Sequence, residues 1–166
     1  ALAPAIRSAD RTIVFTQSIQ ASQDAARRLT DLGIRSSAIH SALPAQLRRA
    51  TLARFATGAL SVLSAPRVLD EGIDVPAADL AVIVGASRSR RQMVQRMGRI
   101  LRRKTAGRLA RLAELFVVGT VEDPAGGAHE GFLSELTDVA DAVRHFRAGT
   151  PAADLIGFLS AKPTVE

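Results

Sequence analysis

Short apolar runs alternate with longer amphipathic segments along most of this chain. β-Branched and aromatic residues gather in brief runs that predict strands, and the segments between them show the three- and four-residue spacing of helices. The expected strands cover residues 12–16, 36–40, 60–65, 80–85 and 115–118. The expected helices cover residues 19–32, 44–55, 90–101, about 130–147 and 152–160. Strands and helices that alternate in this way predict an α/β fold with a parallel sheet flanked by helices.

Glycine and proline mark several of the predicted boundaries. Gly33 follows the helix at 19–32 as a C-cap, and the helix at 44–55 begins on Pro44 and ends near Gly58. The run at 80–85 is almost purely aliphatic before its final glycine, which is typical of a strand buried on both faces. These local signals fix where each element is expected to begin and end.

Composition and charge narrow the class of protein. A chain of 166 residues with 47% hydrophobic content is long enough for one compact domain with a true core. The formal charge of +6 indicates an anionic partner, with nucleic acid first and a membrane surface second. Nearly all of the positive charge is arginine, whose planar fork suits phosphate; an overall compositional bias, visible also in the abundant alanine, explains the arginine content equally well.

Several function classes are disfavoured. With no cysteine, the chain has no disulfide framework and no thiolate nucleophile, and its three scattered histidines do not suggest a metal site. His40, at the end of a predicted strand, is expected to be a structural hydrogen-bonding group. No apolar run reaches the roughly 18 residues of a membrane span, so we expect a cytoplasmic protein with no membrane partner. Because the first residue is not methionine, we expect a piece of a longer protein or a processed product.

The densest cationic cluster lies between Gln95 and Lys104. It holds five cations within residues 96–104, beside Gly98. Arg99 and Arg102 are three residues apart, so on the predicted helix they lie on adjoining faces and can point at the same phosphate. An arginine aimed at a transferring phosphoryl group stabilises the charge that develops there, which is the arginine-finger role.

A second unusual segment, residues 70–76, places three carboxylates around Gly72 after an apolar run. The chain lacks the other groups that phosphoryl transfer requires, which bind the phosphates and magnesium. It contains no G-x-x-x-x-G-K-[ST] loop, and no acidic pair follows an upstream apolar strand to hold magnesium. The isolated chain is therefore not expected to hydrolyse ATP.

Four segments in this order carry a family resemblance. Residues 12–18 resemble helicase motif IV, residues 40–48 with 55–58 resemble the strand, helix and turn that follow it, residues 70–76 resemble motif V, and residues 95–102 resemble motif VI. Together they resemble the C-terminal RecA-like domain of a superfamily 2 (DEAD/DEAH-type) helicase, which is P-loop NTPase-like but has no P-loop of its own. The joined motifs V and VI are most similar to the xeroderma pigmentosum B type of DNA helicase.

The resemblance implies a domain organisation and site roles. It covers residues 11–121, and residues 122–166 are expected to form a helical extension packed on that domain. It implies that Arg99 and Arg102 contact the γ-phosphate of ATP, that Gln95 organises the domain interface, that Asp74 reaches the ribose and that Gly72 allows close backbone approach. ATP and Mg²⁺ would be held mainly by an N-terminal RecA-like domain of the same parent protein, and no metal ligand is expected in this chain.

The nucleic-acid contacts implied by the resemblance fall on Ser18, Ser64 and Arg67. Pro66 departs from the family pattern, because relatives commonly carry Thr or Ser there and proline has neither a hydroxyl nor a backbone N–H. Arg67 is a candidate substitute. DNA is the expected partner, with RNA left open, since contacts to the backbone carry no sequence code.

Two functions follow from these observations. The first is the C-terminal motor domain of an ATP-dependent DNA helicase or translocase, with a role in DNA repair implied by the resemblance. The alternative is a doubly wound module that binds nucleic acid or another anion without ATPase activity. Loss of Arg102 distinguishes these two functions. The motor domain predicts lost ATP turnover, and the binding module predicts weakened binding of nucleic acid.

Overall fold

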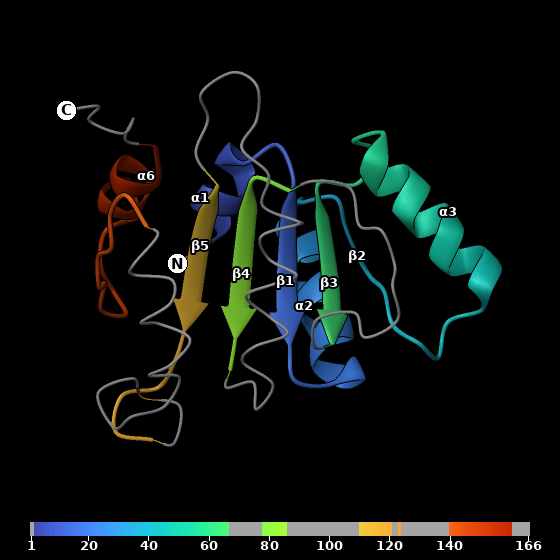
Figure 1. Cartoon of the computed structure of the whole chain (residues 1–166), viewed down its shortest axis with the longest axis horizontal. Coiled ribbons are helices and arrows are strands. Elements are labelled where there is room, and N and C mark those ends of the chain that lie inside the picture. Colours follow the sequence, from blue (N-terminus) through green and yellow to red (C-terminus); the bar gives the residue numbers. More distant parts are fainter. Residues whose placement is uncertain (1, 67–77, 86–109, 121–122, 124–139, 161–166) are drawn as a thin grey trace.

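The computed structural model describes residues 2–66, 78–85, 110–120, 123 and 140–160. Within them, one parallel sheet has the strand order β2-β3-β1-β4-β5 (Figure 1). Its strands are β1 (Thr12–Thr16), β2 (Ser36–Ala38), β3 (Val62–Pro66), β4 (Leu80–Val84) and β5 (Arg111–Leu115). The helices are α1 (Ala3–Ser8), α2 (Ile19–Asp31), α3 (Ala45–Ala56) and α6 (Ala152–Ser160). The predicted α/β fold is confirmed.

The sheet is covered on both faces, because alternate residues of each strand point to opposite sides. Ile13 and Phe15 join one cluster with Phe55 of α3, which is fully buried. Val14 faces the other way and joins a second cluster with Ile6 of α1, against which Leu29 of α2 packs. Figure 1 shows α1 and α2 behind the sheet and α3 at its β2 end. Burial on both faces explains the nearly continuous apolar character of β1 and β4.

Side-chain capping, glycine turns and proline define the ends of α2 and α3. The Ser18 side chain caps α2 by accepting a hydrogen bond from the Ala21 N–H at 3.1 Å. At the other end Gly33 adopts φ +75°, and its N–H donates to the Thr30 carbonyl at 2.8 Å. Helix α3 follows Pro44, and the chain turns at Gly58 with φ +79°. The predicted boundaries of both helices are confirmed to within one residue.

A buried ion pair organises the amino edge of the sheet. Arg111 Nη2, at the start of β5, donates to Asp79 Oδ2 at 2.7 Å, and the Asp79 side chain is only 2% exposed. The same carboxylate accepts the backbone N–H groups of Asp10 and Arg11, just before β1. Asp79 therefore ties the starts of β1, β4 and β5 together.

Three features differ from the sequence-based expectation. The last strand is Arg111–Leu115 and not 115–118, because the Asp79 ion pair and the ladder with β4 set its register. The apolar residues beyond it run past the sheet, and Val118 is 78% exposed.

Residues 140–147 are not helical, although the amphipathic pattern predicted a helix over 130–147. Helix α1 has no counterpart among the predicted elements, while α6 matches the predicted 152–160. The rest of the 130–147 prediction and the helix at 90–101 lie outside the described residues.

Candidate functional site

The candidate site lies at the carboxyl edge of the sheet, where β1 and β4 are neighbours. After β1 the chain passes through α2 to β2 on one side of the sheet, whereas after β4 it continues to β5 on the other side. Adjacent parallel strands whose connections diverge leave a crevice between their carboxyl ends. The topology therefore creates a binding position between the ends of β1 and β4.

A cavity of about 470 Å³ occupies this position. Its polar side is the turn from β1 into α2, and its other walls are apolar and come from α2 and from the ends of β4 and β5. The lining residues are Thr16, Gln17, Ser18, Ala21, Ala25, Val84, Gly85, Leu115, Phe116 and Val117. Ala21 and Ala25 are four residues apart on one face of α2, and their small side chains leave the space open.

The turn that forms the polar wall is held by hydrogen bonds. Thr16 is buried, and its Oγ1 lies 3.2 Å from the Ser18 carbonyl oxygen and 3.3 Å from that of Ala65 in β3. Ser18 is exposed while it caps α2. The N-terminus of a helix carries partial positive charge and orients backbone N–H groups outward, so this turn favours an anionic group.

Gln17 packs on Gly85 across the floor of the cavity. Gly85 adopts φ +84°, and a Cβ at this position would stand 3.0 Å from Gln17 Cδ and 3.2 Å from its Cγ. The Gly85 N–H donates to the Leu115 carbonyl at 3.3 Å, which extends the pairing of β4 with β5 by one residue. Neither residue is among the site residues predicted from the sequence. A glycine directly after an aliphatic strand was the signal that could have identified this close approach.

Ser64 does not lie on the surface. It is 0% exposed within β3, and its Oγ has no hydrogen-bond partner among the described residues. Ser64 pairs with Val14 and points to the same side of the sheet, under α2, whereas Leu63 and Ala65 point to the opposite face. This burial leaves Ser64 without exposed surface in the described part of the chain, and its contact with nucleic acid stays a prediction. The motif position alone did not indicate which face of the strand Ser64 occupies.

The other predicted site residues follow strands that end at this same edge. Strand β3 ends at Pro66, which pairs with Thr16, and residues 67–77 come next in the chain. Strand β4 ends at Val84, and residues 86–109 follow Gly85. Arg67, Gly72 and Asp74 belong to the first segment, and Gln95, Arg99 and Arg102 to the second; all six lie outside the described residues. Strands β3 and β4 therefore end on opposite sides of β1, at the edge that holds the cavity.

His40 matches its predicted structural character. It follows β2, is 5% exposed, and its Nε2 lies 3.2 Å from Gln23 Nε2 of α2. The contact joins α2 to the edge strand. In the part of the chain that the structure describes, no group of three or more His, Asp or Glu side chains is arranged to hold a metal ion. Among the same residues, no helix combines the length and apolar character needed to cross a membrane.

Comparison with known proteins identifies the family. The model of the helicase conserved C-terminal domain matches residues 2–104, so the chain belongs to that family. It is the helicase C-terminal domain of the superfamily 2 DEAD/DEAH-type helicases, and its parallel five-stranded sheet matches the RecA-like fold of these domains.

Relatives include proteins that act on DNA and on RNA. The chain is 43% identical over 75 residues to the DNA 3'-5' translocase XPB2 of Sulfurisphaera tokodaii. The aligned residues cover 45% of this chain and 17% of the relative. It is 37% identical over 95 residues to the ATP-dependent RNA helicase dbp8 of Emericella nidulans, covering 57% of this chain and 18% of the relative. The chain thus spans less than a fifth of the length of these two relatives.

The solved structure of the C-terminal domain of the DEAD-box protein Dbp5 superposes with a TM-score of 0.64 at 17% identity, covering 90% of this chain and 81% of that one. At this identity the likeness supports the fold and nothing further.

Proposed function

We propose that this chain is the second motor domain of an ATP-dependent DNA helicase or translocase. In this proposal it completes the ATPase site of the parent protein with Arg99 and Arg102 and forms part of the nucleic-acid track. An N-terminal RecA-like domain of the same parent protein holds ATP and Mg²⁺. Binding of ATP and Mg²⁺ by another domain fits the sequence of this chain, which has no phosphate-binding loop. It also fits the described residues, which contain no acidic cluster suited to a metal.

The observation that carries the proposal is the common edge of β3, β1 and β4. These three neighbouring parallel strands end together, and the segments with motifs V and VI follow directly after the outer two. Residues that are far apart in sequence can therefore converge on one ligand, as the ligand-binding edge of an open α/β sheet requires. Gly72 and Asp74 are proposed to approach the nucleotide, and Gln95 the interface between the two motor domains.

The proposed nucleic-acid contacts are Ser18, at the positive end of α2, and Arg67, directly after Pro66. Both would bind phosphates, because backbone contacts suit a motor that moves along any sequence. DNA is favoured over RNA by the similarity to the archaeal DNA translocase, which has the higher identity of the two relatives described above. Residues 11–121 are proposed as the motor domain and residues 122–166 as an extension. The hydrogen bond from Arg111 of β5 to the Leu159 carbonyl of α6 supports this arrangement.

The test is nucleic-acid-stimulated ATP hydrolysis by the full-length protein, with wild type compared with Arg102→Ala. Loss of an arginine finger should lower turnover about 10³-fold or more while DNA affinity at fixed salt stays nearly unchanged. Arg28→Ala is the matched control, because Arg28 is exposed in the last turn of α2, at the end of that helix far from Ser18. It should leave both quantities unchanged.

Equal losses of turnover and binding in Arg102→Ala, or a wild type without turnover, would support an anion-binding module instead. Stimulation by single-stranded RNA measured beside DNA decides between the two substrates. Stronger stimulation by RNA would replace the DNA assignment and leave the motor assignment in place.

A further inference from the structure

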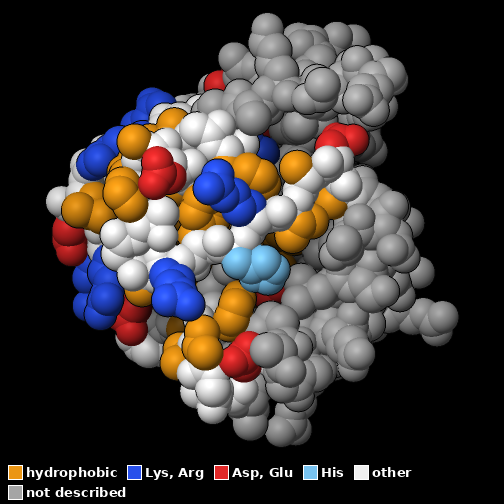
Figure 2. Space-filling view, turned by 90° about the vertical axis from the view of Figure 1, so that its left-hand side faces the viewer, with side chains coloured by type: hydrophobic (Ala, Val, Ile, Leu, Met, Phe, Trp, Pro, Cys, Tyr) orange, Lys and Arg blue, Asp and Glu red, His pale blue; other side chains and the backbone are white. Residues whose placement is uncertain are grey.

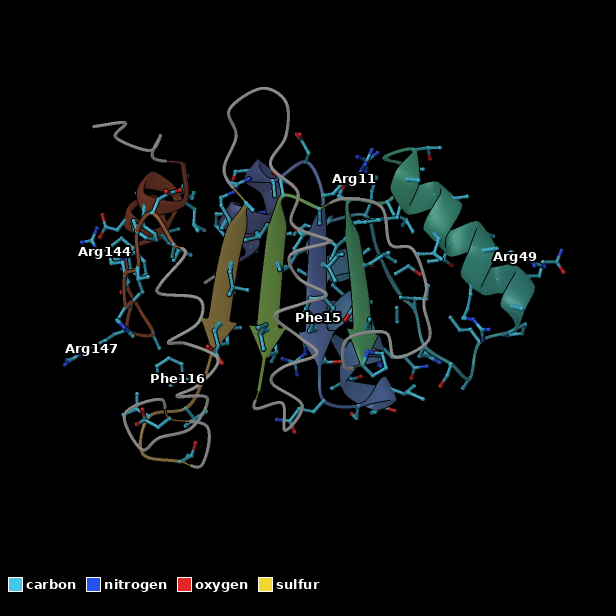
Figure 3. All side chains as sticks on the ribbon, viewed as in Figure 1. Arg11, Phe15, Arg49, Phe116, Arg144 and Arg147 are labelled. Atoms are coloured by element: carbon cyan, nitrogen blue, oxygen red, sulfur yellow. The ribbon has the colours of Figure 1, made fainter. Side chains whose placement is uncertain are left out.

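A basic and aromatic surface lies outside the region that matches the helicase family. It consists of Val143, Arg144, His145, Phe146 and Arg147, which we call the 143–147 surface. All but Phe146 are exposed, and Phe146 is half-buried. Figure 2 looks onto this side of the molecule, where cationic side chains flank a histidine beside apolar ones. Figure 3 shows Arg144 and Arg147 at the end of the molecule opposite α3 and its Arg49.

The aromatic ring of Phe146 connects this surface to the folded domain. It packs edge-to-face on Phe158 of α6, with ring centroids 5.7 Å apart and an interplanar angle of 62°. Helix α6 in turn packs against α1, and the Leu159 carbonyl accepts a hydrogen bond from Arg111 at 3.4 Å. Phe146 is therefore fixed relative to the sheet through α6.

Phe146 also positions a cation. The guanidinium carbon of Arg144 stands over the Phe146 ring, 5.2 Å from its centroid, which is within the range of a cation–π contact. A guanidinium over a ring face keeps its charge and can still donate its N–H groups to an external acceptor. The contact thus positions Arg144 for a ligand without neutralising its charge.

Arg147 is held by the turn that follows it. Its carbonyl accepts hydrogen bonds from Thr150 N–H at 3.1 Å and from Thr150 Oγ1 at 2.8 Å, and Gly149 adopts φ +93°. These bonds fix the backbone at Arg147 and leave its side chain in solvent. Arg144 and Arg147 are therefore both presented from an ordered backbone.

Neither guanidinium has a carboxylate partner in the part of the chain that the structure describes. Exposed arginines elsewhere can find one, as Arg27 does with Asp24 at 2.5 Å. The 143–147 surface contains no acidic residue, and the nearest in sequence, Asp141, makes no ion pair with it. Two fixed, unneutralised guanidiniums on one short segment complement the closely spaced charges of a phosphate backbone.

We propose that the 143–147 surface is a second nucleic-acid contact, where Arg144 and Arg147 bind phosphates of a single strand and Phe146 positions Arg144. The proposal rests on the proposed function, since it needs a motor that acts on nucleic acid. The partner is recognised through its backbone, so the contact adds affinity without sequence preference.

The experiment measures binding of a fluorescent single-stranded DNA oligonucleotide to the full-length protein over a range of salt concentrations. Each phosphate contact with single-stranded nucleic acid contributes about 0.7 to the slope of log affinity against log salt, so Arg144→Ala/Arg147→Ala should reduce the slope by about 1.4. The control Arg28→Ala/Arg49→Ala removes the same charge from two exposed positions elsewhere and should leave the slope unchanged. ATP hydrolysis without nucleic acid should be the same in all three proteins.

Phe146→Leu tests the positioning role separately. It keeps an apolar contact with Phe158 but removes the ring face under Arg144, so affinity should fall about 2- to 5-fold. A Phe146→Leu variant that binds DNA like wild type would overturn the role of the ring.

An unchanged slope in Arg144→Ala/Arg147→Ala, or an equal change in the control, would overturn the proposal while wild-type DNA binding and turnover still support the motor. A variant that binds DNA normally but loses binding to polyglutamate would also overturn it and assign the surface to an acidic protein segment. A wild type that binds no nucleic acid would reject the proposed function and this contact together.

Discussion

Gln17 lies against Gly85 at the edge where the paired strands β1 and β4 end. The side chain that follows β1 and the backbone that follows β4 therefore line the same cavity. Gly85 holds a left-handed φ of +84° that costs an L-residue about 1–2 kcal/mol. The position of Gln17 in the polar wall of the cavity therefore depends on the absence of a side chain at Gly85.

Replacing Gly85 with alanine should lower the free energy of unfolding by about 1–2 kcal/mol, since the backbone strain remains even when Gln17 swings aside. Urea denaturation of the chain measures the change. Gly157→Ala is the matched control, because Gly157 lies within α6 with nothing within 4 Å of the added methyl group. It should stabilise the chain by about 0.5–1 kcal/mol. Equal effects of the two substitutions would show that the conformation at Gly85 carries no strain.

Asp79→Ala should lower the free energy of unfolding by about 3–5 kcal/mol, because it leaves Arg111 buried without its partner. The side chains of this pair are 2% and 14% exposed. If Asp79→Ala does not fold, Asp79→Asn supplies the measurement, since it keeps an acceptor for the Arg11 N–H but removes the charge.

The exposed pair Arg27–Asp24 provides the comparison for the buried one. Its side chains are 66% and 44% exposed. Solvent screening reduces such a pair to about 0–1 kcal/mol, so Asp24→Ala should change stability far less than Asp79→Ala. Similar losses at the two sites would contradict the organising role of Asp79.

Ser18 combines a helix cap with a proposed phosphate contact, and two substitutions separate these roles. Ser18→Ala removes the cap and should cost about 1 kcal/mol of stability, whereas Ser18→Asp keeps a capping oxygen. The aspartate places a negative charge where a phosphate is proposed to bind, so the full-length Ser18→Asp protein should bind DNA more weakly than Ser18→Ala. Wild-type DNA affinity in Ser18→Asp would exclude the contact.

Ser64→Ala should be at least as stable as wild type, because it removes a buried hydroxyl that has no partner in the described part of the chain. DNA affinity should not change. Ser22 is equally buried, but its Oγ donates to the Ile19 carbonyl at 2.7 Å, so Ser22→Ala should be less favourable than Ser64→Ala. A selective loss of DNA binding in Ser64→Ala would instead support the sequence-based assignment of this residue to the nucleic-acid contact.

Local signals were enough for much of the fold. Strand β1 follows from a β-branched and aromatic run, and α2 from its helical spacing and the glycine stop at Gly33. The family also follows from the sequence, because motifs IV, V and VI are contiguous stretches whose residues and order are visible without coordinates. The roles of Arg67, Gly72, Asp74, Gln95, Arg99 and Arg102 remain predictions.

The tertiary structure decided what depends on residues far apart in sequence. The Asp79–Arg111 ion pair placed β5 four residues before the predicted strand, and the packing of Phe146 on Phe158 accompanies a non-helical segment where a helix was expected. By local preference alone, the apolar run at 115–118 suits a strand and the amphipathic pattern at 140–147 suits a helix. Neither element forms as predicted. Only the contacts made across the fold distinguish these alternatives, since a local pattern is a weaker constraint than a buried charge pair or a packed ring.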